Sequence, residues 1–152
     1  MASVTLNLYD IFRRKQASGT GAVDLSSLTV KIQIVTSGYA VNQNTHDFAD
    51  DLGANEVSGT NYTAGGNALA NPVVSLDGSG NVVVDFDDPA VWAQHAAGFS
   101  NGRRAIVYVD RGGAASADEL IGYSDDFGAD KGNVDGDFSA ALNASGLFTS
   151  AR

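Results

Sequence analysis

Short apolar segments separated by glycine-rich turns constrain this fold more than any other feature of the sequence. The chain of 152 residues contains 18 glycines and only two prolines, a composition typical of proteins with many tight turns. Apolar residues occupy every second position over residues 30–34 and again over residues 82–86. This is the period of a β-strand that buries one face. The sequence therefore predicts a mainly β fold built from short strands.

The clearest predicted hairpin joins residues 73–76 to residues 82–86 through the turn Asp77–Gly80. No repeat and no linker divides the sequence, so we expect a single domain over residues 1–152. We expect its strands to form an antiparallel β-sandwich-like fold. The same patterns predict further strands at residues 30–34, 105–109 (apolar throughout and therefore buried on both faces), 120–123 (paired with 105–109) and 138–142.

An N-terminal helix is also expected. The apolar residues from Val4 to Phe12 include a set at i, i+4, i+7 and i+8, which is a helical period. This spacing predicts a helix near residues 5–16, within an N-terminal helix or arm of residues 1–18 that stops before Gly19. A strand from Val4 to Leu8 is the alternative, because apolar residues also alternate there.

A second, short helical segment is expected around Phe48 and Leu52, which are four residues apart. Thr45 is positioned to cap the start of this segment, and Asp47 would lie in its first turn.

Composition excludes several classes of function. The formal net charge is −9 and only nine residues are Lys or Arg, so binding to nucleic acid, which needs clustered cations, is not expected. The chain has no cysteine, which excludes disulfides and thiolate metal sites. No apolar run approaches the ~18 residues of a membrane helix. The positive charges follow the first apolar segment, which is the reverse of the order in a secretory signal, so we expect the chain to be made in the cytoplasm and used at full length.

No stretch of the sequence has both the residues and the structural context of a catalytic motif. Residues 98–102 fit the letters GxSxG, but a nucleophile elbow needs a strand before Ser100, and here the predicted strand follows it. His46 and His95 have no partners at useful spacing. We therefore expect neither an enzyme nor a cofactor.

The acidic stretch Asp125–Asp137 contains several glycines and could present oxygen ligands to Ca²⁺. An EF-hand register would place Lys131 at the first ligand position and Leu142 where a bidentate glutamate belongs. A solvated acidic turn is the expectation, and a bound cation is the alternative.

Several strings spread over most of the chain resemble a family of small virion proteins of tailed bacteriophages. They are HDF (46–48), NEVSGTNYTAGG (55–66), FDDPAVW (86–92), RAIVYVD (104–110), LIGYSDDFG (120–128) and NVDGDFSAALNASGLF (133–148).

The resemblance implies a structural role in the phage particle. The small size and the absence of repeats or a coiled coil favour a capsid decoration, or cement, protein on the outer head surface. Its partner would be the major capsid protein, and trimers at capsid symmetry axes are one expected arrangement. The resemblance also implies synthesis in the cytoplasm of a host bacterium. The alternative function is a tail-associated or receptor- or glycan-binding adhesion module.

Candidate partner contacts are apolar, aromatic and basic side chains that stand out in an acidic chain. For the aromatic residues a place in the core is the competing interpretation, and for the basic clusters it is a solvated surface. The candidates are Leu8, Ile11, Phe12, Arg13, Arg14, Lys15, Tyr62, Trp92, Arg103 and Arg104.

Overall fold

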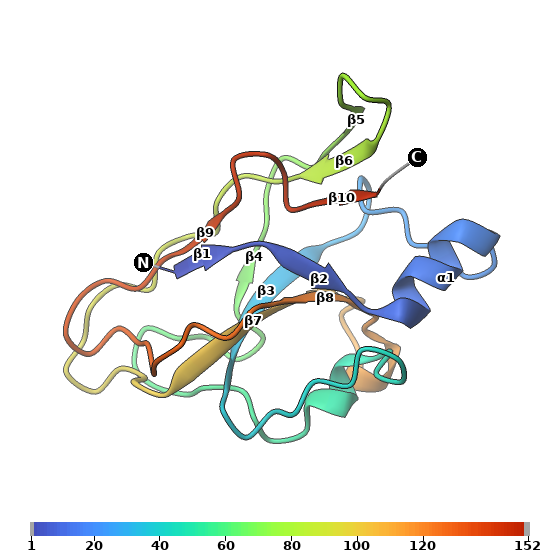
Figure 1. Ribbon diagram of the computed structural model, residues 1–152. Coiled ribbons are helices and arrows are strands. Elements are labelled where there is room, and N and C mark those ends of the chain that lie inside the picture. The colour runs from blue at the N-terminus through green and yellow to red at the C-terminus, as the bar shows by residue number, and fades with distance from the viewer. Residues whose placement is uncertain (1, 151–152) are drawn as a thin grey trace.

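A five-stranded antiparallel sheet forms the centre of the computed structural model, which describes residues 2–150 (Figure 1). Its strand order is β2–β8–β7–β3–β4. The strands are β2 (Leu6–Leu8), β8 (Leu120–Ser124), β7 (Gly102–Val109), β3 (Val30–Thr36) and β4 (Asn67–Ala68).

The central pair β3–β7 is the most deeply buried part of this sheet. Residues 105–109 of β7 are all buried, as their continuous apolar run predicts. The two strands run antiparallel with Ile32 opposite Val107, and Ile32 and Ile34 are fully buried. Strand β8 pairs with β7 on the other side, which confirms the predicted pairing.

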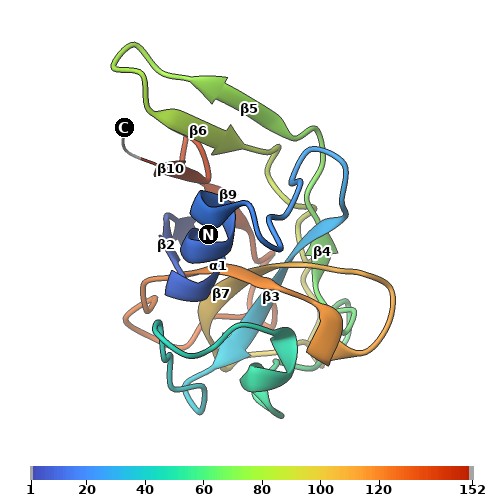
Figure 2. The ribbon, with the colours of Figure 1, turned by 90° about the vertical axis from the view of Figure 1, so that its right-hand side faces the viewer.

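A second antiparallel sheet of three strands contains the predicted hairpin. Its order is β10–β6–β5, with β5 at Val73–Leu76, β6 at Val82–Asp85 and β10 at Phe148–Ser150. Figure 2 shows this sheet beside the five-stranded one, with β5 at the outer edge of the molecule. The two sheets share one hydrophobic core, so the expectation of a mainly β, sandwich-like domain is confirmed.

A two-stranded parallel sheet joins the two ends of the chain, and the sequence did not predict it. Strand β1 (Ala2–Val4) pairs with β9 (Ala140–Leu142), with Ala2 opposite Ala140 and Val4 opposite Leu142. Val4 is fully buried as a result. The strand expected over residues 138–142 corresponds to β9, which begins only at Ala140, and β10 follows at Phe148–Ser150.

The helix α1 spans Asp10–Ser18, so the predicted start near residue 5 is wrong. Residues 6–8 instead form β2, which pairs with β8, and this agrees with the alternative strand at Val4–Leu8. Tertiary pairing decides between two apolar periods that both fit. The predicted end before Gly19 is confirmed, because Gly19 takes the left-handed conformation (φ 71°) that closes many helices.

The second helical segment is a 3₁₀-helix, η1, over Ala49–Leu52. The Asp51 carboxylate accepts the backbone N–H of Asp47 at 2.8 Å, so it ties down the start of the turn. The expectation that Thr45 caps the segment is wrong, because η1 begins after Phe48. A further 3₁₀ turn, η2, covers Ala115–Ala117. None of the helices within residues 2–150 has the length and apolar character needed to cross a membrane.

Asn133 fastens three loops to one another at the end of the core. Its side chain is fully buried, and its Oδ1 accepts the N–H of Phe99 at 2.9 Å. Its Nδ2 donates to the carbonyl oxygens of Ala93 at 2.8 Å and Thr60 at 3.1 Å. A buried amide that satisfies three backbone groups fixes their relative positions, because leaving any of them unpaired is costly.

We expect Asn133→Ala to lower the free energy of unfolding by about 3 kcal/mol, because the Phe99 N–H and the Thr60 carbonyl would lose this buried partner. Urea denaturation followed by tryptophan fluorescence measures the loss. Asn101→Ala, at an exposed position, is the control and should change stability by less than about 0.5 kcal/mol. Equal, small losses in both variants would contradict the role assigned to Asn133.

We expect Val84→Asp to prevent folding or to cost at least about 3 kcal/mol, because Val84 is only 4% exposed and burying a carboxylate is costly. The matched control is Val74→Asp, at the residue directly opposite in β5, which is 54% exposed. The control should cost less than about 1 kcal/mol. Circular dichroism and urea denaturation compare the two, and equal losses would contradict the different burial of Val84 and Val74.

Candidate interaction surface

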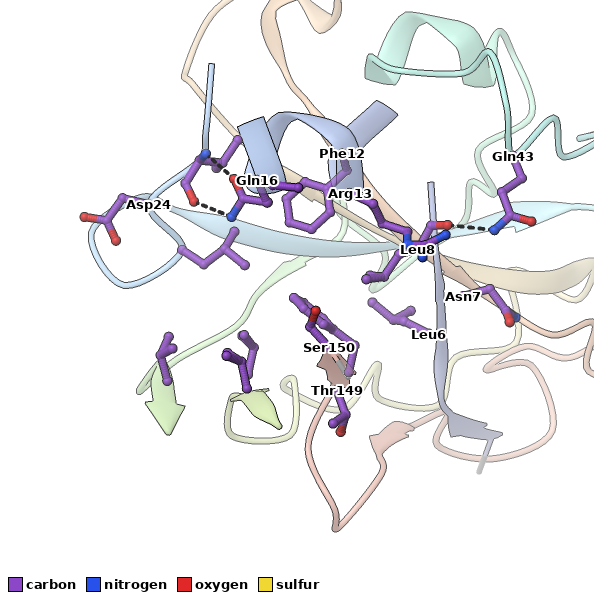
Figure 3. Close-up of a pocket in the computed structure, with 17 residues that line it drawn as sticks. Leu6, Asn7, Leu8, Phe12, Arg13, Gln16, Asp24, Gln43, Thr149 and Ser150 are labelled. Carbon is purple, nitrogen blue, oxygen red and sulfur yellow. Dashed lines mark hydrogen bonds between the residues drawn. The ribbon is translucent and has the colours of Figure 1, made fainter. Parts of the chain in front are cut away.

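An open groove of about 840 Å³ lies between α1, β2 and the three-stranded sheet. Figure 3 shows side chains from these elements facing one another across it. Its apolar lining comes from β2, α1, the loop after α1, the hairpin and β10: Leu6, Leu8, Phe12, Ala17, Val23, Leu25, Val74, Val82, Val84 and Phe148.

Two aromatic rings join the helix side of the groove to its sheet side. Phe12 of α1 and Phe148 of β10 meet edge to face, with their ring centroids 6.0 Å apart. Phe148 is paired with Val84 in the neighbouring strand, and all three side chains are buried. This part of the groove is thus a continuation of the hydrophobic core.

Hydrogen bonds fix the side of the groove that is formed by α1, the loop after it and the end of β2. The Gln16 side chain donates to the Val23 carbonyl at 3.0 Å and accepts the Val23 N–H at 2.6 Å, which fixes the loop after α1 against the helix. Gln43 donates to the Leu8 carbonyl at 2.9 Å, where β2 leads into α1. These bonds make the groove a preformed feature of the fold, which lowers the entropic cost of filling it.

The rim of the groove is polar and the interior is apolar. Arg13 lies at the rim with 62% of its side chain exposed, and it pairs with Asp10 at 3.2 Å. Asp24, on the facing loop, accepts bonds from Ser26 and Ser27, and these bonds lower the pKa of its carboxyl group. An apolar interior inside a polar rim is typical of a surface that binds another polypeptide.

The hairpin beside the groove carries most of the exposed large apolar side chains among the described residues. The exposed fractions are 53% for Val73, 54% for Val74, 69% for Leu76 and 39% for Val82. Sequence reasoning predicted the hairpin but not its exposure. No local signal could have found this exposure, because an apolar run without alternation, such as residues 73–76, is typical of a strand buried on both faces.

Three of the ten predicted contact residues line the groove: Leu8, Phe12 and Arg13. Of these, Phe12 is 3% exposed and mainly supports the groove from within the core. The other N-terminal candidates lie on α1 but not in the groove: Ile11 is half-buried, Arg14 is exposed, and Lys15 places its Nζ 4.6 Å from the centroid of the Phe48 ring.

The predicted aromatic contacts Tyr62 and Trp92 belong to the core cluster near Asn133. Trp92 is 2% exposed and stacks on Tyr62 at 5.9 Å between centroids. The Tyr62 hydroxyl donates to Glu56 at 2.8 Å and accepts the Ile34 N–H, and burial raises its pKa above the usual range. Both side chains therefore lie where the alternative interpretation put them, in the core.

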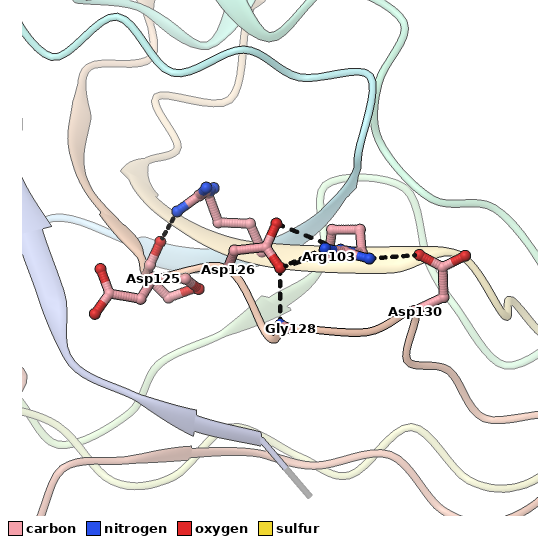
Figure 4. Close-up of polar contacts among 7 residues, drawn as sticks. Arg103, Asp125, Asp126, Gly128 and Asp130 are labelled. Carbon is pink, nitrogen blue, oxygen red and sulfur yellow. Dashed lines mark hydrogen bonds and ion pairs between the residues drawn. The ribbon is translucent and has the colours of Figure 1, made fainter.

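Arg103 and Arg104 lie on β7, away from the groove, and both have partners within the chain. Arg103 binds Asp126 at 2.7 Å and Asp130 at 3.4 Å (Figure 4). Arg104 donates to the Ser124 carbonyl, and its guanidinium carbon lies 5.8 Å from the centroid of the Tyr123 ring. These pairs stabilise the end of β8 and the loop after it.

Four carboxylates of the acidic stretch, those of Asp125, Asp126, Asp130 and Asp137, accept hydrogen bonds from protein donors. Besides the Arg103 pairs, Asp125 accepts from the Asn7 amide at 2.9 Å and Asp137 accepts the Gln94 N–H at 2.8 Å. Within residues 2–150 no three His, Asp or Glu side chains come together as metal ligands would.

The residues of the GxSxG pattern do not form a nucleophile elbow. Ser100 is exposed, and it precedes β7 instead of following a strand. His46 belongs to a chain of side-chain hydrogen bonds. Its Nδ1 lies 2.7 Å from the Tyr39 hydroxyl, and that hydroxyl lies 2.7 Å from the Tyr9 hydroxyl. Burial raises the pKa of both tyrosines, so these hydroxyls stay protonated in the ordinary pH range.

Comparison with models of protein families, with curated proteins and with solved structures finds no match to this chain.

We expect acid to weaken the contact between Arg103 and the acidic loop. The Gly128 N–H and the Arg103 guanidinium lower the pKa of Asp126 below its usual value, so its contribution to stability is complete above pH ~4 and is lost as the pH falls further. Asp126→Asn should lower the urea midpoint at pH 7, and the difference from wild type should shrink at pH 3. Asp135→Asn, at an exposed position, is the control. A pH-independent difference would contradict the assignment.

Proposed function

We propose that this protein is a structural component of a tailed-phage virion, and specifically a decoration protein that binds the major capsid protein on the outer head surface. The observation that carries the proposal is the preformed groove with its apolar interior beside the exposed hairpin. The strings that resemble phage virion proteins support the same role. A groove of this kind is suited to binding a polypeptide.

In the proposed mechanism, an apolar segment of the major capsid protein occupies the groove between α1 and the three-stranded sheet. Each bound copy buries surface at a junction between capsid subunits, and this stabilises the assembled shell by mass action. The acidic surface of the chain keeps free copies soluble until they meet the lattice.

Reconstitution tests the proposal. Purified protein is added to heads of the phage that encodes it, assembled without it, and the particles are imaged and heated. We expect the protein to coat the head and to raise the temperature at which the shell opens. Labelling of the tail with a bare head would instead favour the tail or adhesion role, and head binding without thermal stabilisation would contradict the cementing mechanism.

A matched pair of variants tests the groove. Val82→Glu places a charge among groove-lining side chains, and Val91→Glu makes the same change at a 52% exposed valine that does not line the groove. We expect head binding to weaken at least tenfold, about 1.4 kcal/mol, in the first variant and to be unchanged in the second. Equal binding by both would show that the capsid contact lies elsewhere.

A further inference from the structure

We propose that two copies of this chain pair through the outer edges of their β5 strands, in antiparallel register around a two-fold axis at Ser75. The pairing joins two three-stranded sheets into one sheet of six strands. It does not depend on the proposed virion role, because it follows from the geometry of this edge alone.

The outer edge of β5 presents unpaired backbone groups. Strand β5 ends the order β10–β6–β5, and Figures 1 and 2 both show it outermost. The Asp77 N–H donates to the Asn81 carbonyl across the hairpin, so residues 75 and 73 also bond to β6 in the alternating antiparallel pattern. The N–H and C=O groups of Val74 and Leu76 consequently point outward.

The neighbouring residues select one register for a second copy. If Val74 of one copy lies opposite Leu76 of the other, each pair exchanges two hydrogen bonds, and two-fold symmetry gives four. A register shifted toward the start of β5 would bring in Pro72, which has no N–H to donate. A register shifted the other way would reach the turn Asp77–Gly80.

The side chains at this edge are complementary to those of a second copy. Directly opposite residues share a face of the sheet, so Val74 and Leu76 of one copy would pack against Leu76 and Val74 of the other. Both side chains are more than half exposed in the single chain. Residues 72–76 carry no charge in a chain whose net charge is −9, so this edge is a place where two copies can approach without repulsion.

This edge lacks most of the features that keep sheet edges apart. Lysine, a bulge or an inward-pointing charge commonly protects an exposed strand, and none of these is found in β5. The occupant we infer is a second copy, because the same edge supplies both hydrogen-bonding partners and both apolar partners. A strand from another protein would need a complementary segment that fits the four residues between Pro72 and the turn Asp77–Gly80.

The contact is small, so the dimer should be concentration-dependent. Pairing of two four-residue strands buries well under the ~800 Å² per partner of a standard stable interface. Copies held close together on a surface would pair at much lower bulk concentration. The contact also closes at two copies, so it is incompatible with a trimer built through this edge.

Cysteine cross-linking tests the register, and the chain contains no cysteine to interfere. Ser75→Cys places two thiols opposite each other at a non-hydrogen-bonded pair, where Cα atoms lie ~4.5 Å apart, within the span of a disulfide. We expect mild oxidation at high protein concentration to give a cross-linked dimer in good yield.

Ser79→Cys is the matched control, because it is exposed in the same hairpin but would lie roughly 25 Å from its counterpart across the axis. It should cross-link at least tenfold more slowly. Equal rates for the two variants would overturn the proposed register.

Sedimentation velocity of the wild-type protein provides an independent measurement. We expect a monomer–dimer equilibrium that shifts toward dimer between low micromolar and high micromolar concentrations. Leu76→Pro removes an outward N–H without breaking a bond to β6, so it should weaken the dimer at least tenfold while circular dichroism stays unchanged. A monomer at all concentrations, a trimer, or a dimer unaffected by Leu76→Pro would each overturn the proposal. None of these results depends on capsid binding.

Discussion

The hydrogen bonds of the Asn133 side chain fix the end of the molecule where its loops converge. They join segments that are 34 to 73 residues apart in sequence, and the backbones can approach only because glycines line the junction. A Cβ atom on Gly132 would overlap the Phe99 carbonyl, and one on Gly59 would overlap the Phe99 N–H. Because the loops are held together at this junction, the rings of Trp92, Phe99 and Phe138 pack into one cluster. Strand β7 begins at Gly102, three residues after Phe99.

The strands that could be predicted from the sequence are those whose burial follows a local rule. The period of two over residues 30–34 and 82–86, the continuous apolar run at 105–109 and the turn Asp77–Gly80 each specify structure without distant partners. The N-terminal segment was different. Its apolar residues fit both a strand and a helix, and only the pairing of β1 and β2 with β9 and β8 decides the outcome.

The candidate surface was less predictable, because it depends on how distant elements meet. The groove brings α1 next to β10 and the hairpin, which lie more than 50 residues further along the chain, and no local pattern records that contact. Individual residue types were also ambiguous. Trp92 was a candidate contact but lies in the core, whereas Val74 and Leu76 read as ordinary strand residues and are exposed. Exposure of an apolar side chain is a property of the whole fold.

The parallel pairing of β1 with β9 has a consequence for how the chain acquires its structure. Strand β1 can find its partner only after residues 140–142 have been synthesised, because Ala2 pairs with Ala140, a residue far along the chain. Pairing over such a separation carries a large loop-closure cost and slows folding. Until then the side chain of Val4, which is fully buried in the folded chain, is exposed to solvent. We therefore expect the pairing of β1 with β9 to be a late step of folding.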